Sequence, residues 1–157
     1  MTDAALTRAP RPAPLAQFLM TPRGFFLFLS AVTLALWLIR SLAFPGTGGD
    51  DGEQLVFAQY LAIGYFPRNP PLYTWLVIAA EQVFGVSVLA VAAVKFLSVW
   101  GSCAALFAAG RMLFRDDRYA VLAGLSPLAM YLVFWDSVTG LTDSALAMLL
   151  CALTFLI

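Results

Sequence analysis

Three carboxylates lie within four residues of one another, in the sequence Asp50-Asp51-Gly52-Glu53. The chain has only nine acidic residues and is 62% hydrophobic, and the cluster follows an apolar stretch long enough to cross a membrane. Carboxylates this close to lipid are costly and usually functional. A carboxylate can take a proton from an attacking group, or hold a divalent cation together with its neighbours. The cluster is therefore the first candidate for chemistry.

A metal site in this chain would have to use oxygen ligands. The sequence contains no histidine, and carboxylate oxygens favour Mg or Mn over Zn. Asp50, Asp51 and Glu53 are the candidate ligands of such a divalent cation. The pattern by itself does not require any cofactor.

Helix capping is an alternative role for part of the cluster. Asp50 is a good N-cap residue, and Glu53 three residues later resembles a capping box. Acidic residues also suit the positive end of a helix dipole. Capping does not account for Asp51 or for the glycine-rich run at residues 45–49, so both interpretations stay open.

Four apolar stretches surround these polar residues and predict an all-α integral membrane protein. They cover residues 24–44, 86–110, 119–135 and 143–157, and a spanning helix needs about 20 residues, with about 17 as the lower limit. The first two qualify easily and the third at the short end. The fourth is expected to be incomplete, in the N-terminal part of a longer protein. A cleaved signal peptide is the less favoured interpretation of the first stretch, because Arg40 lies near its end and 23 residues precede it.

The overall composition agrees with a membrane protein. The mean hydropathy is +0.87 and 11% of the residues are charged, against about 25% in soluble domains. A formal net charge of zero gives no support to nucleic-acid binding. Cys103 and Cys151 both lie in apolar stretches, which predicts packing roles rather than a disulfide framework.

The distribution of basic residues predicts the orientation. Six arginines lie in residues 1–23 or between the second and third spans, whereas the opposite side holds only Arg40 and Arg68. The positive-inside rule then places the N-terminus in the cytoplasm. Residues 1–23 are expected to be a cytoplasmic tail, and residues 45–85 an outer loop that carries the acidic cluster. We expect a multi-pass protein of the plasma membrane, which is the inner membrane in bacteria.

The outer loop is too apolar to be simply solvated. Residues 51–63 fit a short helix that ends at Gly64, and Pro71 can open a second helix that runs to Phe84 and ends at Gly85. Aromatic residues are dense in both segments, and Tyr and Trp favour the headgroup level. We therefore predict two interfacial helices.

The outer loop and the spans resemble the polytopic GT-C glycosyltransferases that use polyprenyl-phosphate sugars. Bacterial aminoarabinose-lipid A transferases and protein O-mannosyltransferase-like enzymes belong to this superfamily. Their first outer loop begins with an acidic pair. A glutamine comes next, then a Gly-Tyr pair, and then a His-Pro-Pro-Leu-like turn. The corresponding residues here are Asp50-Asp51, Gln59, Gly64-Tyr65 and Asn69-Pro70-Pro71-Leu72, and further matches are Lys95 and Leu141-Thr142-Asp143. Asp51 replaces the usual Glu, and Asn69 replaces a frequent His.

The resemblance implies an inverting transfer of a sugar from a polyprenyl-phosphate donor on the outer face of the membrane. A carboxylate takes the acceptor's proton, and Asp50 is the expected general base. Asp51 and Glu53 are expected to orient Asp50 or to hold a cation. Asp143 is a further catalytic candidate, with helix capping as the alternative.

The departing lipid phosphate needs positive charge beside it. Lys95 is the main candidate, since a charge inside a span costs at least about 2.5 kcal/mol on insertion scales. Snorkelling to the headgroups is the alternative. Arg40 and Arg68 are weaker candidates, and Tyr65 is a further candidate for substrate binding.

The expected partners are the lipid-linked donor, membrane lipids and an acceptor that is a lipid, a glycan or a protein. Two other functions stay open. A transporter or flippase fragment would use Lys95 and Asp50 to mark a substrate path, whereas a non-enzymatic membrane scaffold would leave Asp51 and Lys95 without a role.

Overall fold

The computed structural model describes residues 14–44, 46–47, 49–66 and 69–157. Regular structure in these residues is helical, apart from an isolated bridge between Phe66 and Asn69. The predicted all-α class is therefore confirmed. The elements are α1 (Pro14–Leu19), α2 (Pro22–Ala43), α3 (Gly49–Phe57), α4 (Pro71–Phe84), α5 (Val88–Leu113), α6 (Asp117–Ala129), α7 (Tyr131–Thr139), α8 (Asp143–Leu153) and the 3-10 helix η1 (Thr154–Leu156).

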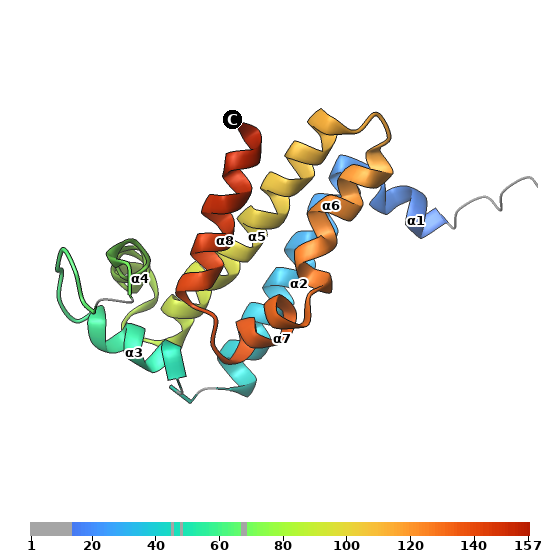
Figure 1. Cartoon of the computed structure of the whole chain (residues 1–157). Helices are drawn as coiled ribbons and strands as arrows, with labels where there is room; N and C mark the ends of the chain where they lie inside the picture. The colour runs from blue at the N-terminus through green and yellow to red at the C-terminus, as the bar shows by residue number, and fades with distance from the viewer. Residues whose placement is uncertain (1–13, 45, 48, 67–68) are drawn as a thin grey trace, which may run out of the picture.

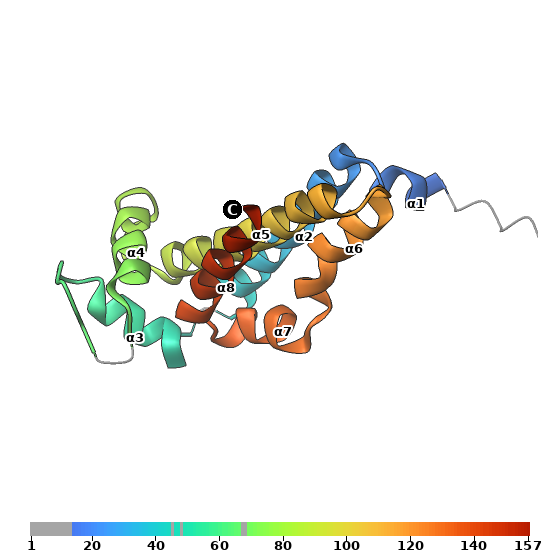
Figure 2. The same cartoon turned by 45° about the horizontal axis from the view of Figure 1, so that its top comes forward.

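Helix α5 is the centre of the bundle. It contacts α2, α4, α6 and α8, and Figures 1 and 2 show it running between α2 and α8. The short helices α3 and α4 lie at the end of α5 that is remote from α1 (Figures 1 and 2). The loop between α7 and α8 lies toward the same end. We call this end of the bundle, remote from α1, the α3–α4 end.

Helices α2 and α5 are long and apolar enough to cross a membrane, at 22 and 26 residues. The start of α2 is well defined, because the Thr21 hydroxyl accepts a hydrogen bond from the Gly24 amide and Pro22 occupies the first turn. Helices α6 and α7 together form a third candidate span, bent by 49°. The apolar helix that begins at Asp143 is shorter than these candidates, so the structure gives two or three candidate spans where about four were predicted.

The bend in the third candidate span has a local cause. Pro127 has no N–H and cannot donate to the Ala123 carbonyl as a helical residue would. The Ser126 hydroxyl donates to that carbonyl instead, at 2.8 Å. The helix then ends, and α7 begins after Met130. The span predicted for residues 119–135 therefore falls on two helices, which together form one bent candidate span.

Small residues allow the long helices to pack closely. A Cβ atom on Gly124 would lie 2.7 Å from the ring of Phe25 and 2.8 Å from Phe107. Those two rings stack with centroids 4.2 Å apart. This contact joins α2, α5 and α6 at the α1 end of the bundle, as in the glycine-mediated packing of membrane helices.

The two helices predicted for the first loop are present. Helix α4 has the predicted bounds, and Gly85 ends it with a φ of 71°, which suits glycine. Helix α3 covers Gly49–Phe57 rather than residues 51–63. The chain turns earlier because the Tyr65 hydroxyl accepts from the Ala62 amide and donates to the Tyr60 carbonyl, which closes a compact loop after α3.

The predicted cytoplasmic tail is covered only in part. Residues 1–13 lie outside the described residues, and residues 14–19 form α1.

Candidate active site

Asp51 is the centre of a buried charge cluster. Its side chain has no exposed surface; Oδ1 accepts from Lys95 Nζ at 2.7 Å, and Oδ2 accepts from Arg40 Nη2 at 2.6 Å and Nε at 3.0 Å. Lys95 and Arg40 are buried as well. We call Arg40, Asp51 and Lys95 the ion cluster. Two cations and one carboxylate give it a formal charge of +1.

The ion cluster fixes the position of α3. Arg40 belongs to α2, Asp51 to α3 and Lys95 to α5, so one carboxylate ties three helices together. The Arg40 guanidinium also donates to the carbonyls of Phe44 and Gly46, just beyond the end of α2. The chain between α2 and α3 is thereby held against the same group.

Asp50 lies in the opposite environment although it is the next residue. Successive residues of an α-helix point about 100° apart, and the Asp50 side chain is exposed at the surface of the bundle. It borders a hollow of about 340 Å³ at the α3–α4 end. We call this the Asp50 hollow; its lining residues are Gly49, Asp50, Asp136, Gly140, Leu141 and Ser144.

The far wall of the Asp50 hollow is the turn between α7 and α8. A Cβ atom on Gly140 would lie 3.5 Å from Asp50 Oδ2, so the turn comes to van der Waals distance of the carboxylate. Leu141 follows with a φ of 55°, a left-handed conformation that is unusual for a branched residue. Such strained positions cluster at functional sites.

Asp143 lies beside this hollow, at the first residue of α8. Its Oδ1 accepts a hydrogen bond from Gln54 Nε2 at 3.0 Å, and Gln54 Oε1 accepts one from Thr74 Oγ1 at 2.9 Å. Burial raises the pKa of Asp143 to about 6, and the charges of Asp50 and Glu53 add to the effect. Asp143 therefore changes charge near neutral pH, as acid–base groups in enzymes do.

Neither Asp50 nor Asp143 occupies the N-cap position that the capping interpretation predicts. Asp50 is the second residue of α3, within its first turn. Thr142, not Asp143, occupies the N-cap position of α8. Both carboxylates still face helix N-termini, where the dipole favours negative charge.

The remaining predicted residues lie elsewhere. Tyr65 packs its ring against Phe57 and Tyr60 in the loop after α3. Glu53 is half-buried on α3 and lies close enough to affect Asp143. Arg68 lies outside the described residues. The structure thus places Asp50 at the hollow and Asp143 beside it, and assembles Arg40, Asp51 and Lys95 separately in the interior.

The predicted metal ligands do not converge. Asp51 binds two cationic side chains, and the described part of the chain holds no group of three or more His, Cys, Asp or Glu residues arranged for a metal ion. A divalent cation at Asp50, Asp51 and Glu53 stays a prediction.

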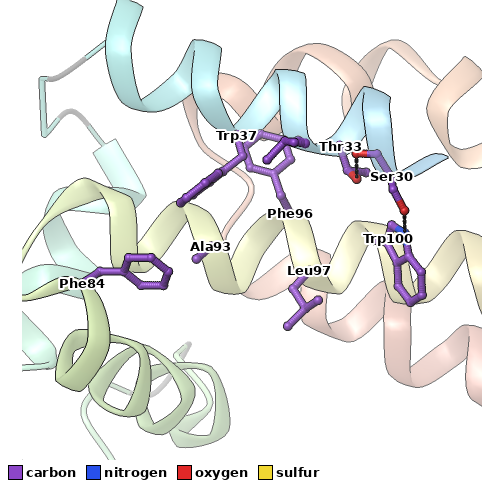
Figure 3. Close-up of a pocket in the computed structure, with 9 residues that line it drawn as sticks. Ser30, Thr33, Trp37, Phe84, Ala93, Phe96, Leu97 and Trp100 are labelled. Carbon is purple, nitrogen blue, oxygen red and sulfur yellow. Dashed lines mark hydrogen bonds between the residues drawn. The ribbon is translucent and has the colours of Figure 1, made fainter. Parts of the chain in front are cut away.

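A larger hollow lies on another face of the bundle, and its chemistry is different. It measures about 450 Å³ and is formed by α2, α5 and Phe84 at the end of α4 (Figure 3). Trp100 Nε1 donates to Ser30 Oγ, and the Thr33 hydroxyl donates to carbonyls of its own helix. In the described part of the chain no ionisable side chain lines this groove. The groove therefore suits hydrocarbon, and the Asp50 hollow is the better candidate for proton chemistry.

Sequence reasoning missed several residues of the site. Gln54 and Thr74 connect Asp143 to α3 and α4, while Asp136, Gly140 and Ser144 line the hollow. Gln54 stands one helical turn after Asp50 and directly before the apolar residues Leu55 to Phe57, which was the available signal. Thr74 meets Gln54 because α4 packs against α3, whereas Asp136, Gly140 and Ser144 face the site because α7 and α8 return toward α3.

Residues 68–157, more than half of the chain, match the family described as dolichyl-phosphate-mannose-protein mannosyltransferase. The chain belongs to this family. The part of the chain that matches the family includes Lys95 and Asp143, while Asp50 and Asp51 precede it. The resemblance to GT-C glycosyltransferases is thereby confirmed.

Two curated relatives come from Rhizobium johnstonii. The lipopolysaccharide core galacturonosyltransferase RgtA is 30% identical over 96% of this chain, which corresponds to 28% of RgtA. The lipopolysaccharide core galacturonosyltransferase RgtB is 33% identical over 60% of this chain and 19% of RgtB. This member of the mannosyltransferase family thus spans about a quarter of the length of RgtA. No solved structure matches the chain.

Proposed function

We propose that the protein is a membrane glycosyltransferase that moves a sugar from a polyprenyl-phosphate donor to an acceptor on the outer face of the membrane, with inversion. Family membership supports the glycosyltransferase class. The observation that carries the mechanism is the contrast between two adjacent carboxylates. Asp51 is neutralised by two cations in the bundle interior, whereas Asp50 faces an open hollow in which an acceptor can reach it.

In the proposed reaction Asp50 acts as the general base. The acceptor oxygen attacks the anomeric carbon, a new C–O bond forms, and the bond from that carbon to the phosphate oxygen breaks. The acceptor proton passes to Asp50, and the polyprenyl phosphate leaves with the electron pair. A single displacement of this kind inverts the anomeric configuration.

The leaving phosphate is the second charge that the mechanism must accommodate. The ion cluster carries a formal charge of +1 behind Asp50, and a net positive charge in a water-poor interior stabilises a nearby phosphate. Lys95 and Arg40 act through this excess charge, or bind the phosphate directly if a donor draws them from Asp51. Arg68 is the third cation proposed for this role.

The substrates and location are proposed from two sources. The basic residues favour a cytoplasmic N-terminus and a site on the outer face of the bacterial inner membrane. The names of RgtA and RgtB specify galacturonosyl transfer to the lipopolysaccharide core. We therefore propose a glycan of the cell envelope as the acceptor, and a uronic acid as the first sugar to test.

The test is sugar transfer by the purified, reconstituted full-length protein with radiolabelled polyprenyl-phosphate sugars. Asp50→Asn preserves the size of the side chain but removes its basicity, so transfer should fall by about 100- to 10,000-fold while donor binding persists. Asp117→Asn is the matched control, because Asp117 lies in the first turn of α6 and its carboxylate forms an exposed ion pair with Arg111.

Three results would contradict the proposal in different ways. An active Asp50→Asn with an inactive Asp143→Asn would move the base to α8. Equal losses in Asp50→Asn and Asp117→Asn would indicate a general structural effect. Movement of the lipid donor across the bilayer without any transfer would favour a flippase.

A further inference from the structure

Gln54 is a buried amide whose two ends both have partners. It is 1% exposed, and it lies one turn after Asp50 on α3. Its Nε2 donates to Asp143 Oδ1 on α8, and its Oε1 accepts from the Thr74 hydroxyl on α4. Through these two hydrogen bonds the Gln54 side chain connects α3, α4 and α8 beside the Asp50 hollow.

The direction of the amide follows from its partners. Gln54 could in principle present either its oxygen or its nitrogen to Asp143. An oxygen facing an ionised carboxylate would be repelled, whereas the N–H forms a charge-assisted hydrogen bond. Thr74 is fully buried, and its hydroxyl donates to Gln54 Oε1. An ionised carboxylate can only accept, so the Gln54 N–H points at Asp143, and donation by Thr74 to Oε1 then holds the amide in that orientation.

We propose that Gln54, oriented by Thr74, is a positioning residue that holds the Asp143 carboxylate in place and in its ionised form beside Asp50. This rests on the proposed function, in which Asp143 lies beside the hollow where Asp50 takes up the acceptor proton. Asp50 and Glu53 on α3 and Tyr73 on α4 interact electrostatically with Asp143, and Asp136 on α7 lines the adjoining hollow. The carboxylates of Asp50 and Glu53 oppose the ionisation of Asp143, and Gln54 is a neutral donor that favours it.

A first measurement requires no substrate. Infrared titration of the full-length protein follows the Asp143 carboxyl band, identified by its loss in Asp143→Asn. Gln54→Met removes the amide at similar size, so the titration midpoint of Asp143 should rise by about one pH unit, as expected for the loss of one hydrogen bond to a charged group. Thr74→Val should give a smaller shift in the same direction.

The matched control is Gln59→Met. Gln59 follows α3, but it is exposed and its amide donates to the Leu55 carbonyl. It should leave the midpoint of Asp143 unchanged. An unshifted midpoint in folded Gln54→Met, or an equal shift in Gln59→Met, would overturn the proposal. If Gln54→Met does not fold, Thr74→Val decides by the same criterion.

Sugar transfer is the second readout. Gln54→Met should lower kcat about tenfold, leave the KM for the donor within about twofold, and move the acid limb of the kcat profile to higher pH. The sign follows because a higher pKa keeps Asp143 protonated, and uncharged, to a higher pH. An unmoved acid limb in an active Gln54→Met enzyme would overturn the positioning role. If the infrared midpoint of Asp143 shifts in Gln54→Met but the wild-type protein transfers no sugar, the positioning role of Gln54 stands and the proposed function is rejected.

Discussion

At the scale of single residues, the pair Asp50-Asp51 divides two tasks between neighbours. The Asp51 carboxylate forms ion pairs with Arg40 and Lys95, and the Asp50 carboxylate remains open to the hollow. The helical turn of about 100° between them is sufficient to separate the roles. Lys95, predicted from the sequence to bind a phosphate, has Asp51 as its partner in the structure, so the phosphate role stays a prediction.

The net charge of the ion cluster predicts unequal effects of removing its members. Asp51→Asn leaves two buried cations without a counter-ion, which should cost about 3–5 kcal/mol of the free energy of unfolding. Lys95→Met leaves the neutral pair of Arg40 and Asp51, so the loss should be about 1–3 kcal/mol. Denaturant unfolding of the purified full-length variants measures both.

Asp51→Glu is the control that keeps the charge, and it should recover part of the loss. Equal destabilisation by Asp51→Asn and Lys95→Met would contradict the charge argument. Donor binding by folded Lys95→Met tests the phosphate role separately, because weaker binding is expected only if Lys95 acts on the phosphate.

At the scale of elements, glycines set how closely the long helices approach. Gly124 on α6 faces Phe25 and Phe107 at distances that a methyl group cannot share. The three atoms nearest to a Cβ added on Gly101 of α5 all belong to the Leu149 side chain, and its terminal methyl would lie at 3.0 Å. The end of a leucine side chain can move, whereas two stacked rings cannot separate without moving a helix.

Gly124→Ala should therefore destabilise the bundle by about 1–3 kcal/mol, the usual range for overpacking. Gly101→Ala should have a smaller effect and serves as the matched control. Thermal unfolding in detergent compares the two variants. A larger loss for Gly101→Ala would show that the α2–α5–α6 contact is looser than described.

Much of this element pattern could be predicted from the sequence. The bounds of α4 follow from Pro71 and Gly85, and α2 and α5 follow from uninterrupted apolar runs. The break after α6 was missed because the apolar pattern continues through Pro127 and Met130. Hydropathy alone therefore shows a single stretch. The end of α3 was missed because the Tyr65 hydroxyl, supplied from beyond the predicted helix, closes the chain at residues 60–62.

The site was less accessible from the sequence than the fold. Asp50 and Asp143 stand out by type and place, but their neighbours depend on distant segments. Lys95 meets Asp51 across 44 positions, and Gln54 meets Asp143 across 89. Spacing along one chain carries little information about which of several polar groups will meet at such separations.

At the scale of the whole molecule, the orientation in the membrane is the main prediction. Six arginines on one side against two on the other predict that the Asp50 hollow lies on the outer face. A topology reporter fused after Gly85 should be active outside, and one fused after Arg115 should be active in the cytoplasm. The reverse pattern would remove the hollow from the outer face and with it the proposed location of the reaction.

The ion cluster also constrains the order in which the molecule is assembled. Lys95 enters the bilayer on α5 at a cost of at least about 2.5 kcal/mol on insertion scales, and its counter-ion is on a helix of nine residues. A helix this short is not stable alone, so α3 can dock only against spans that are already inserted. The cost of burying Lys95 is offset at that late step. We therefore expect the Asp50 hollow, one wall of which is α3, to be completed only after the spans have been inserted.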